Sequence, residues 1–298
     1  MSVIFLFIDG VGLGEEFEAN PFSQSDYPGF SSMSGGRPFT KNAAEIIEKD
    51  HVFKPVDAAL GVEGLPQSGT GQATLFSGNN ASKVIGKHFG PFPHSGIKHL
   101  LNEESLFGKA QKLGKSCQFL NAYPDIFFKR AKRRKRWTCT TLMTQKAGMK
   151  LNSTEEIKKG EALTAEITQE AWRKRLNADV PQISPEKAAK RLLNQAKKFD
   201  LLLHEYYLTD KAGHARDMKK AAEYLTIYGR FLEYLIQQKP EEVTIVLSSD
   251  HGNVEDLSTK THSLNKVPLF AIGPGAHHFA KAESIMDVTP GILKVLEG

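Results

Sequence analysis

The sequence of 298 residues contains little cysteine and no long hydrophobic run. Its two cysteines, Cys117 and Cys139, are too few for a disulfide framework and lack the spacing of metal ligands. No segment reaches the ~18 consecutive apolar residues of a membrane-spanning helix. The apolar N-terminal run, residues 3–8, has no basic segment before it and leads directly into Asp9. We therefore expect reduced thiols in a soluble, cytoplasmic protein with no membrane partner.

Excess charge is also absent from most of the chain. The formal net charge is +5, yet seven cations lie within residues 129–136, so the remainder carries −2. A single cationic run, without regular aromatic residues apart from Trp137, is typical of a solvated face rather than of a nucleic-acid site. We expect no nucleic-acid partner. Arginines of the run, such as Arg133 or Arg134, are instead predicted to bind an anionic substrate.

Four runs of apolar residues are typical of buried strands, and two amphipathic segments are typical of helices. The predicted strands are 3–8, 201–208, 243–247 and 267–272, and the predicted helices begin at Pro185, after Ser184 as N-cap, and near Met218. This order predicts an α/β fold with a mostly parallel sheet and helices on both faces. Residues 1–84 and 198–298 are predicted to form the core, and residues 85–197 an inserted cap or substrate region.

Three of the strand-like runs are followed by an aspartate. Asp9 follows the first, Asp210 the second and Asp250 the third. The carboxyl ends of parallel strands face one crevice, where three carboxylates would repel each other unless cations lay between them. Two histidines, His251 and His214, lie close in sequence to two of these aspartates, and a third, His262, lies in a polar loop. This ligand set favours Zn²⁺ or Mn²⁺.

Residues 65–78 are predicted to form a loop that enters a short helix. A hydroxyl at such a helix start would lie at the positive end of the dipole, which favours an alkoxide and the phosphate it attacks. Ser68 and Thr70 are both candidates, and either could simply cap the helix.

The ordered motifs resemble the alkaline phosphatase superfamily, and within it the phosphatase domain of cofactor-independent phosphoglycerate mutases and phosphopentomutases. The similar segments cover about the first 80 and last 100 residues, and they are 7–12, 210–214, 249–255, 261–268 and 284–293. In this superfamily the nucleophile lies ten residues before a glycine, so the resemblance implies Ser68 when counted back from Gly78.

The resemblance also implies two divalent metal ions, Mn²⁺ or Zn²⁺ with Mg²⁺ as a further candidate. One ion would be held by Asp9, Asp250, His251 and the Ser68 oxygen, and the other by Asp210, His214 and His262. Such a pair clamps the attacking and leaving oxygens of an in-line displacement. We therefore predict a phosphohydrolase that acts on a small anionic phosphate ester through a phosphoserine.

Three alternatives remain beside this prediction. A phosphosugar mutase would pass the phosphoryl group to a second hydroxyl of the substrate, which requires a closing lid. A non-catalytic metal- or phosphate-binding protein would use the same ligands without turnover. A sulfatase is disfavoured, because Ser68 is not followed by the proline and arginine which that chemistry needs. The sequence does not specify the substrate or the oligomeric state.

Overall fold

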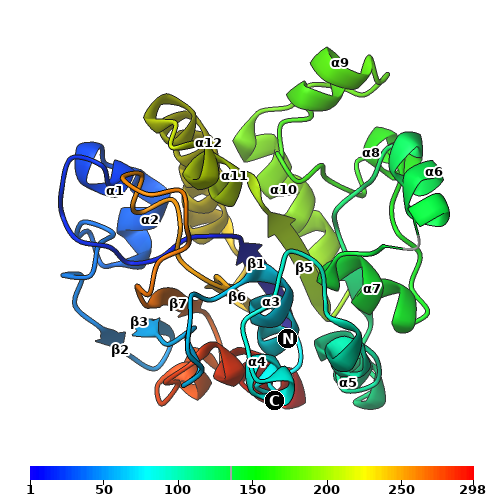
Figure 1. Ribbon diagram of the computed structural model, residues 1–298. Helices are drawn as coiled ribbons and strands as arrows, with labels where there is room; N and C mark the ends of the chain where they lie inside the picture. The colour runs from blue at the N-terminus through cyan, green and yellow to red at the C-terminus, as the bar shows by residue number, and fades with distance from the viewer. Residues whose placement is uncertain (135) are drawn as a thin grey trace.

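A seven-stranded sheet organises the computed structural model, which describes residues 1–134 and 136–298. The strands are β1 (Ser2–Ile8), β2 (Ile46–Ile47), β3 (His51–Val56), β4 (Cys117–Phe119), β5 (Leu201–Tyr206), β6 (Val243–Ser248) and β7 (Val267–Ile272). Their spatial order is β2-β3-β7-β6-β1-β5-β4 (Figure 1). Strands β6, β1, β5 and β4 are parallel, whereas β7 runs antiparallel to both β6 and β3. The predicted mostly parallel sheet is confirmed.

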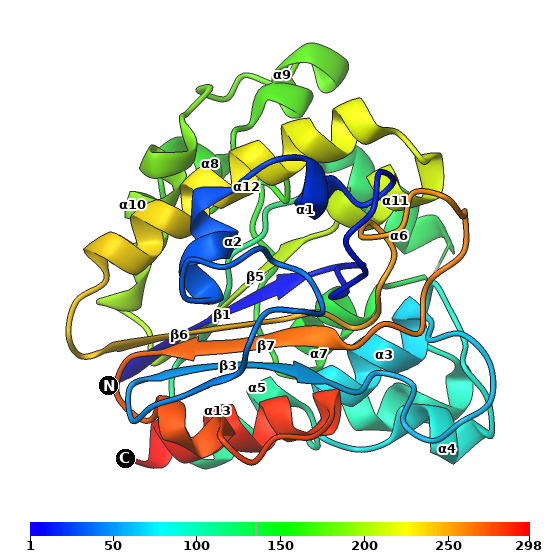
Figure 2. The same cartoon turned by 90° about the vertical axis from the view of Figure 1, so that its left-hand side faces the viewer.

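Helices cover both faces of this sheet, as Figure 2 shows edge-on. On one face lie α1 (Pro21–Gln24), α2 (Pro28–Met33), α10 (Pro185–Ala196) and α12 (Met218–Gln238). On the other lie α3 (Ser68–Leu75), α4 (Ala81–Ile85), α5 (Leu106–Lys112), α7 (Cys139–Lys146) and α13 (Val288–Glu297). The remaining α-helices are α6 (Asp125–Arg134), α8 (Thr154–Lys159), α9 (Glu170–Leu176) and α11 (Leu208–Ala215). Within the described residues, no helix is both long and apolar enough to cross a bilayer.

Strand β1 contributes to both hydrophobic cores because its side chains alternate between the two faces. Val3, Phe5 and Phe7 pack with α3, α5 and α13, and the residues between them pack with α2, α10 and α12. All six apolar side chains of residues 3–8 are fully buried. Because burial of each such side chain stabilises a fold by ~1.5–3 kcal/mol, β1 is a rigid base for the residues that follow it.

The local signals for two helices are confirmed, and one strand boundary is corrected. Helix α10 begins at Pro185, with the Ser184 hydroxyl accepting a hydrogen bond from the Lys187 N–H. Helix α12 spans Met218–Gln238. The strand predicted over 201–208 ends at Tyr206, and α11 already begins at Leu208. The residues after Tyr206 leave the sheet there, so Asp210 is carried by a helix and not by a strand end.

Part of the segment 85–197 packs into the core layers. Strand β4 extends the sheet, with Cys117 paired to Leu201, and α10 packs against α12 and β5. A separate small cluster, which includes Ile157 and Val180, lies under the remaining loops of the segment. The boundaries predicted at residues 85 and 197 stay a prediction, but the segment supplies core elements as well as elements outside the layers.

Candidate metal centre

Two of the predicted aspartates meet where β1 and β6 end. Asp9 directly follows β1, and Asp250 lies two residues after β6, the strand beside it. Both side chains are buried, and His251 lies between them. Its Nε2 is 3.5 Å from Asp9 Oδ1 and 3.5 Å from Asp250 Oδ2. These three groups form one set whose ligand atoms are close enough to share a cation.

The other three predicted ligands form a second group beside the first. Asp210 lies in the first turn of α11, and His214 follows it one helical turn later. His262 Nε2 lies 3.1 Å from His214 Nε2 and 3.6 Å from Asp210 Oδ1. The His262 ring stacks on that of His251 with centroids 3.7 Å apart. The two groups therefore form one continuous centre at the end of the sheet toward which β1 points (Figure 2).

Ser68 joins this centre, whereas Thr70 does not. Ser68 is the first residue of α3, and its hydroxyl lies 3.0 Å from His251 Nε2. The Thr70 hydroxyl is occupied elsewhere, because it donates to the Gln67 carbonyl and accepts from the Phe89 N–H. Of the two hydroxyls left open by the sequence, the geometry favours Ser68.

The hydrogen bonds of the histidines fix which ring nitrogens face the centre. The Nδ1 atoms of His214, His251 and His262 contact the carbonyls of Lys260, Gly252 and Pro66 at 2.8, 3.4 and 2.6 Å. A carbonyl can only accept, so each Nδ1 carries the proton and each Nε2 presents a lone pair to the centre. The Nε2 atoms of His262 and His214 are 3.1 Å apart, so they can share either a proton or a metal cation. Histidines anchored in this way are typical of metal ligands.

Unpaired carboxylate oxygens point to the same conclusion. Among the described residues, Asp9 Oδ1 and Asp250 Oδ2 are buried atoms without a hydrogen-bond partner. Burial and the neighbouring Asp250 raise the pKa of Asp9 well above its usual value, and burial and Asp210 do the same for Asp250. Burial also lowers the pKa of His251. Unpaired carboxylates beside neutral imidazoles fit divalent cations, which would replace the missing partners.

Neutral side chains and one buried glutamate position the ligands. Gln72 donates to Asp9 Oδ2 at 3.3 Å, and Asn253 donates to Asp210 Oδ1 at 2.6 Å. Glu255 is fully buried and accepts from the N–H groups of Gly12 and Asn253. It thereby joins the loop after β1 to the loop after β6. The sequence motif contained Asn253 and Glu255, but sequence analysis gave them no role.

Two glycines allow the close approach of these segments. Gly10 has φ +68°, and a Cβ built there would lie 2.7 Å from the Asp210 Cβ. A Cβ on Gly71 would lie 2.7 Å from the Asp250 carbonyl oxygen. Contacts this short require the neighbour to move, so both positions depend on the absence of a side chain. Gly71 in particular lets α3 present Ser68 beside Asp250.

Sequence analysis missed a further polar pair behind the centre. Glu205 is a buried glutamate within β5, and the Thr140 hydroxyl of α7 donates to its Oε2 at 2.7 Å. Burial raises the pKa of Glu205 to about 7. A charged residue inside the apolar run 201–208 was the available signal for Glu205. Thr140 had none, because only the tertiary fold brings α7 to β5.

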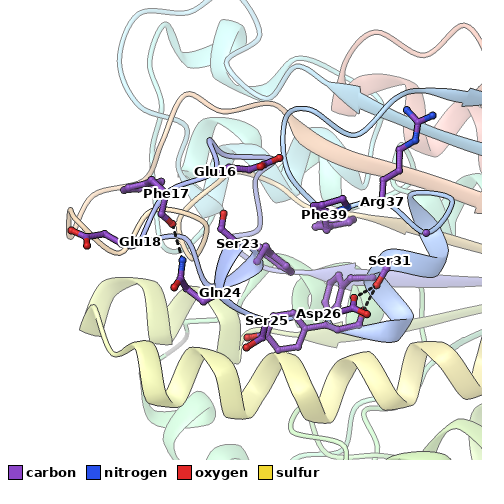
Figure 3. Close-up of a pocket in the computed structure, with 15 residues that line it drawn as sticks. Glu16, Phe17, Glu18, Ser23, Gln24, Ser25, Asp26, Ser31, Arg37 and Phe39 are labelled. Carbon is purple, nitrogen blue, oxygen red and sulfur yellow. Dashed lines mark hydrogen bonds between the residues drawn. The ribbon is translucent and has the colours of Figure 1, made fainter.

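A cavity of about 650 Å³ lies elsewhere, beside α1 and α2 (Figure 3). Figure 3 shows Glu16, Glu18 and Arg37 among its lining side chains. None of the seven predicted site residues lines it. Its size therefore does not make it the place of the predicted chemistry.

The chain matches a known protein family. The chain matches the model of the metalloenzyme superfamily over residues 1–297. It is similar to 2,3-bisphosphoglycerate-independent phosphoglycerate mutases, with 28% identity over 127 residues to that of Desulforudis audaxviator and 30% over 128 residues to that of Lawsonia intracellularis. Each match covers 39% of this chain and 24% of the relative. The aligned part therefore spans about a quarter of the length of these curated relatives.

Solved structures share the fold over nearly the whole chain. A protein from Pyrococcus horikoshii has a TM-score of 0.60 at 13% identity, covering 99% of this chain and 96% of that one. The alkaline phosphatase of an Antarctic bacterium has a TM-score of 0.57 at 14% identity, with 99% and 97% covered. At these identities the likeness concerns the fold alone. The resemblance to the alkaline phosphatase superfamily is confirmed.

Proposed function

Because the chain belongs to the metalloenzyme superfamily, whose members use divalent metal ions, we propose that it is a two-metal phosphohydrolase. Its substrate would be a small phosphate ester, and the phosphoryl group would pass through Ser68. One observation carries this proposal: the Ser68 hydroxyl lies 3.0 Å from His251 Nε2, inside the group of ligands drawn from four separate segments of the chain.

The proposed ligand sets follow the two clusters. The first consists of Asp9, Asp250 and His251, whose ligand atoms converge, with Ser68 beside His251. The second consists of Asp210, His214 and His262. The atoms that converge on Asp210 are those of His251 and His262, and His214 joins this set through its contacts with Asp210 and His262. When bound, divalent cations in these sets would lower the pKa of the Ser68 hydroxyl and balance the charge on the oxygens around phosphorus. The identity of the ions, Mn²⁺, Zn²⁺ or Mg²⁺, is part of the test below.

The side chains of this chain would orient the transfer. In the proposed reaction, Ser68 Oγ bonds to phosphorus as the bond from phosphorus to the ester oxygen breaks, and water then releases phosphate from Ser68. The N-terminal end of α3 favours the negative charge that gathers there. Hydrogen bonds between Nδ1 and backbone carbonyls orient the three imidazoles, and Glu255 joins the loop after β1 to the loop after β6.

A phosphosugar mutase is the second candidate, because the curated relatives named above are phosphoglycerate mutases. A mutase must exclude water while its substrate reorients. The match covers only 24% of the first of these relatives. Similarity over so short a part does not assign the activity of the complete mutase to this chain. Hydrolysis therefore remains the first proposal.

The test combines turnover with detection of the covalent intermediate. Wild-type protein is incubated with para-nitrophenyl phosphate and with Mn²⁺, Zn²⁺ or Mg²⁺ added separately, and acid-quenched samples are examined by mass spectrometry. We expect free phosphate and a phosphorylated peptide containing Ser68. Ser68→Ala should lose turnover by about a thousandfold or more, while Thr70→Val, which removes the other hydroxyl, should remain active. No turnover of para-nitrophenyl phosphate with any of the three metals, together with no phosphorylated Ser68 peptide, would overturn the proposal.

A further inference from the structure

A second cavity, here named the α6–α9 cavity, opens beside the metal centre. It has a volume of about 560 Å³ and is lined by residues of α6, α9, the loop before α6 and the segment around the end of β5. In Figure 1, α9 lies above β5 and α6 lies to its right. The size falls within the range of ~300–1,000 Å³ typical of small-molecule sites.

The α6–α9 cavity borders the proposed reaction centre. Glu205 lines it, and its partner on the neighbouring strand, Phe7, lies two residues before Asp9. Lys211, the residue after Asp210, also lines the cavity. Asn121 fixes this wall, because its side chain hydrogen-bonds both the N–H and the carbonyl of Glu205. A group attached to phosphorus at Ser68 therefore has this cavity next to it.

The walls are mainly apolar and aromatic. Thirteen of the 21 lining residues are apolar, as is typical of sites that bury most of the surface of a small molecule. Ile126, Leu176 and Tyr207 are 43%, 44% and 48% exposed, and all three line this one cavity. Tyr123 and Phe127 also line it, with their rings stacked at 4.1 Å. Large exposed apolar groups that converge on one cavity indicate an apolar ligand.

Cations outnumber carboxylates in the same walls. Arg130, Arg136, Arg175 and Lys211 face two carboxylates, Glu166 and Glu205. Arg136 lies 5.7 Å from the centroid of the Phe92 ring, so charge and aromatic surface are adjacent. The sequence had suggested Arg133 or Arg134 for anion binding. Arg133 is exposed and is not among the lining residues, and the side chain of Arg134 lies outside the described part of the chain.

We propose that the α6–α9 cavity binds the leaving group of the substrate, and that this group is an aromatic ring bearing a second anionic substituent. The proposal rests on the proposed phosphohydrolase function. The aromatic walls would stack on the ring, and Arg130 and Arg175 would pair with the second anion. This substrate class differs from the small phosphosugars of a mutase.

The experiment separates binding from turnover. Metal-reconstituted wild-type protein is titrated by calorimetry with three non-hydrolysable probes: para-carboxybenzylphosphonate, benzylphosphonate and hydroxypropylphosphonate. The corresponding phosphate esters, with glycerol phosphate as the non-aromatic one, are assayed for turnover. We expect the probes to bind in that order, the first most tightly. Loss of one charge-assisted hydrogen bond in Arg130→Gln or Arg175→Gln should weaken binding of the carboxylated probe by about tenfold, and binding of benzylphosphonate, which lacks the carboxylate, by less.

Matched controls lie on the same helices. Arg133→Gln removes a cation from α6, and Lys174→Gln removes one from α9, yet neither residue lines the α6–α9 cavity. Both should leave all three affinities unchanged. Tyr207→Ala should weaken both aromatic probes, whereas Leu113→Ala, a comparably exposed apolar site elsewhere, should weaken neither.

The possible outcomes are distinct. Hydrolysis of glycerol phosphate without preference for aromatic probes would overturn the leaving-group proposal and keep the proposed function. Tight binding of the carboxylated probe, lost in Arg130→Gln but not in Arg133→Gln, with no turnover of any ester, would support the cavity and overturn the function. Equal losses in Arg130→Gln and Arg133→Gln would overturn the role of the cavity cations.

Discussion

Asp250 offers a sharp test of the metal centre, because the same substitution should have opposite effects with and without metal. Its side chain is fully buried, and its Oδ2 has no hydrogen-bond partner among the described residues. Asp250→Asn keeps the shape of the side chain and removes its charge. In metal-free protein we expect the variant to be at least as stable as the wild type, because a buried charge without a partner is costly.

The expected changes in the free energy of unfolding follow from the raised pKa of Asp250 and from the linkage between metal binding and folding. Each unit by which burial raises the pKa of a carboxyl costs the ionised form ~1.4 kcal/mol at neutral pH. Metal at a hundred times its Kd stabilises the folded wild type by ~2.7 kcal/mol, which raises the Tm of a chain of this size by ~4 °C. Asp250→Asn should lose most of that metal-dependent rise, because an amide is a weaker ligand than a carboxylate.

The pH dependence has a definite sign. Burial and Asp210 raise the pKa of Asp250 in the folded protein well above its usual value of 3.8. The stabilising contribution of this group to metal-free protein is therefore complete below about pH 4 and is lost as the pH rises through the folded value. The stability of metal-free wild type relative to metal-free Asp250→Asn should fall from pH 5 to pH 8.

The assay is thermal unfolding by circular dichroism, with chelator or with Mn²⁺ or Zn²⁺, across that pH range. Asp200→Asn is the matched control, because hydrogen bonds from Ser116 lower the pKa of Asp200 and the residue lies outside the metal centre. It should destabilise the protein equally with and without metal. The reasoning is refuted if the Tm of the wild type does not change when either metal is added. It is also refuted if metal-free Asp250→Asn is clearly less stable than metal-free wild type.

Further measurements test other parts of the centre. Metal analysis of reconstituted His262→Ala should show a loss of about one ion per chain relative to wild type, because His262 belongs to only one of the two proposed sets; unchanged content would contradict its role. Metal content of Ser68→Ala should stay close to that of the wild type although its turnover is lost, since the carboxylate and imidazole ligands remain. Gly71→Ala should destabilise the protein by about 1–3 kcal/mol in chemical denaturation, because its Cβ would meet the Asp250 carbonyl. A Gly71→Ala variant of wild-type stability would show that α3 and the Asp250 loop can separate freely.

The sequence predicted the parts of the fold that depend on local patterns. Residues 3–8 and 243–247 are apolar on both faces, and they form the neighbouring central strands β1 and β6. The aspartates after them therefore had to meet, and they do. Ser184 before Pro185 likewise marked the start of α10, because a hydroxyl N-cap and a proline at the first position act locally.

Other features depend on tertiary contacts and left no local signal. Strand β4 has three residues, 117–119, and exists because it pairs with β5. Thr140 reaches Glu205 only because α7 packs on the face of the sheet toward which the Glu205 side chain points. The cations of the α6–α9 cavity could not be chosen from the basic run, since Arg130 lines the cavity and Arg133, three residues later in α6, does not.

Charge balance connects the metal centre to the α6–α9 cavity. Asp9, Asp210 and Asp250 carry three negative charges when ionised, and a Ser68 alkoxide adds a fourth, which two divalent cations would neutralise. A phosphate ester dianion then brings two charges that the centre itself does not balance. Burial raises the pKa of Glu205 to about 7, so this neighbour is partly protonated at neutral pH and adds less than a full charge. Positive groups beside the centre include the cations of the α6–α9 cavity, among them Lys211, which follows Asp210 in the sequence. Substitution of these cations should therefore weaken binding of every phosphate ester somewhat, and of doubly anionic esters most.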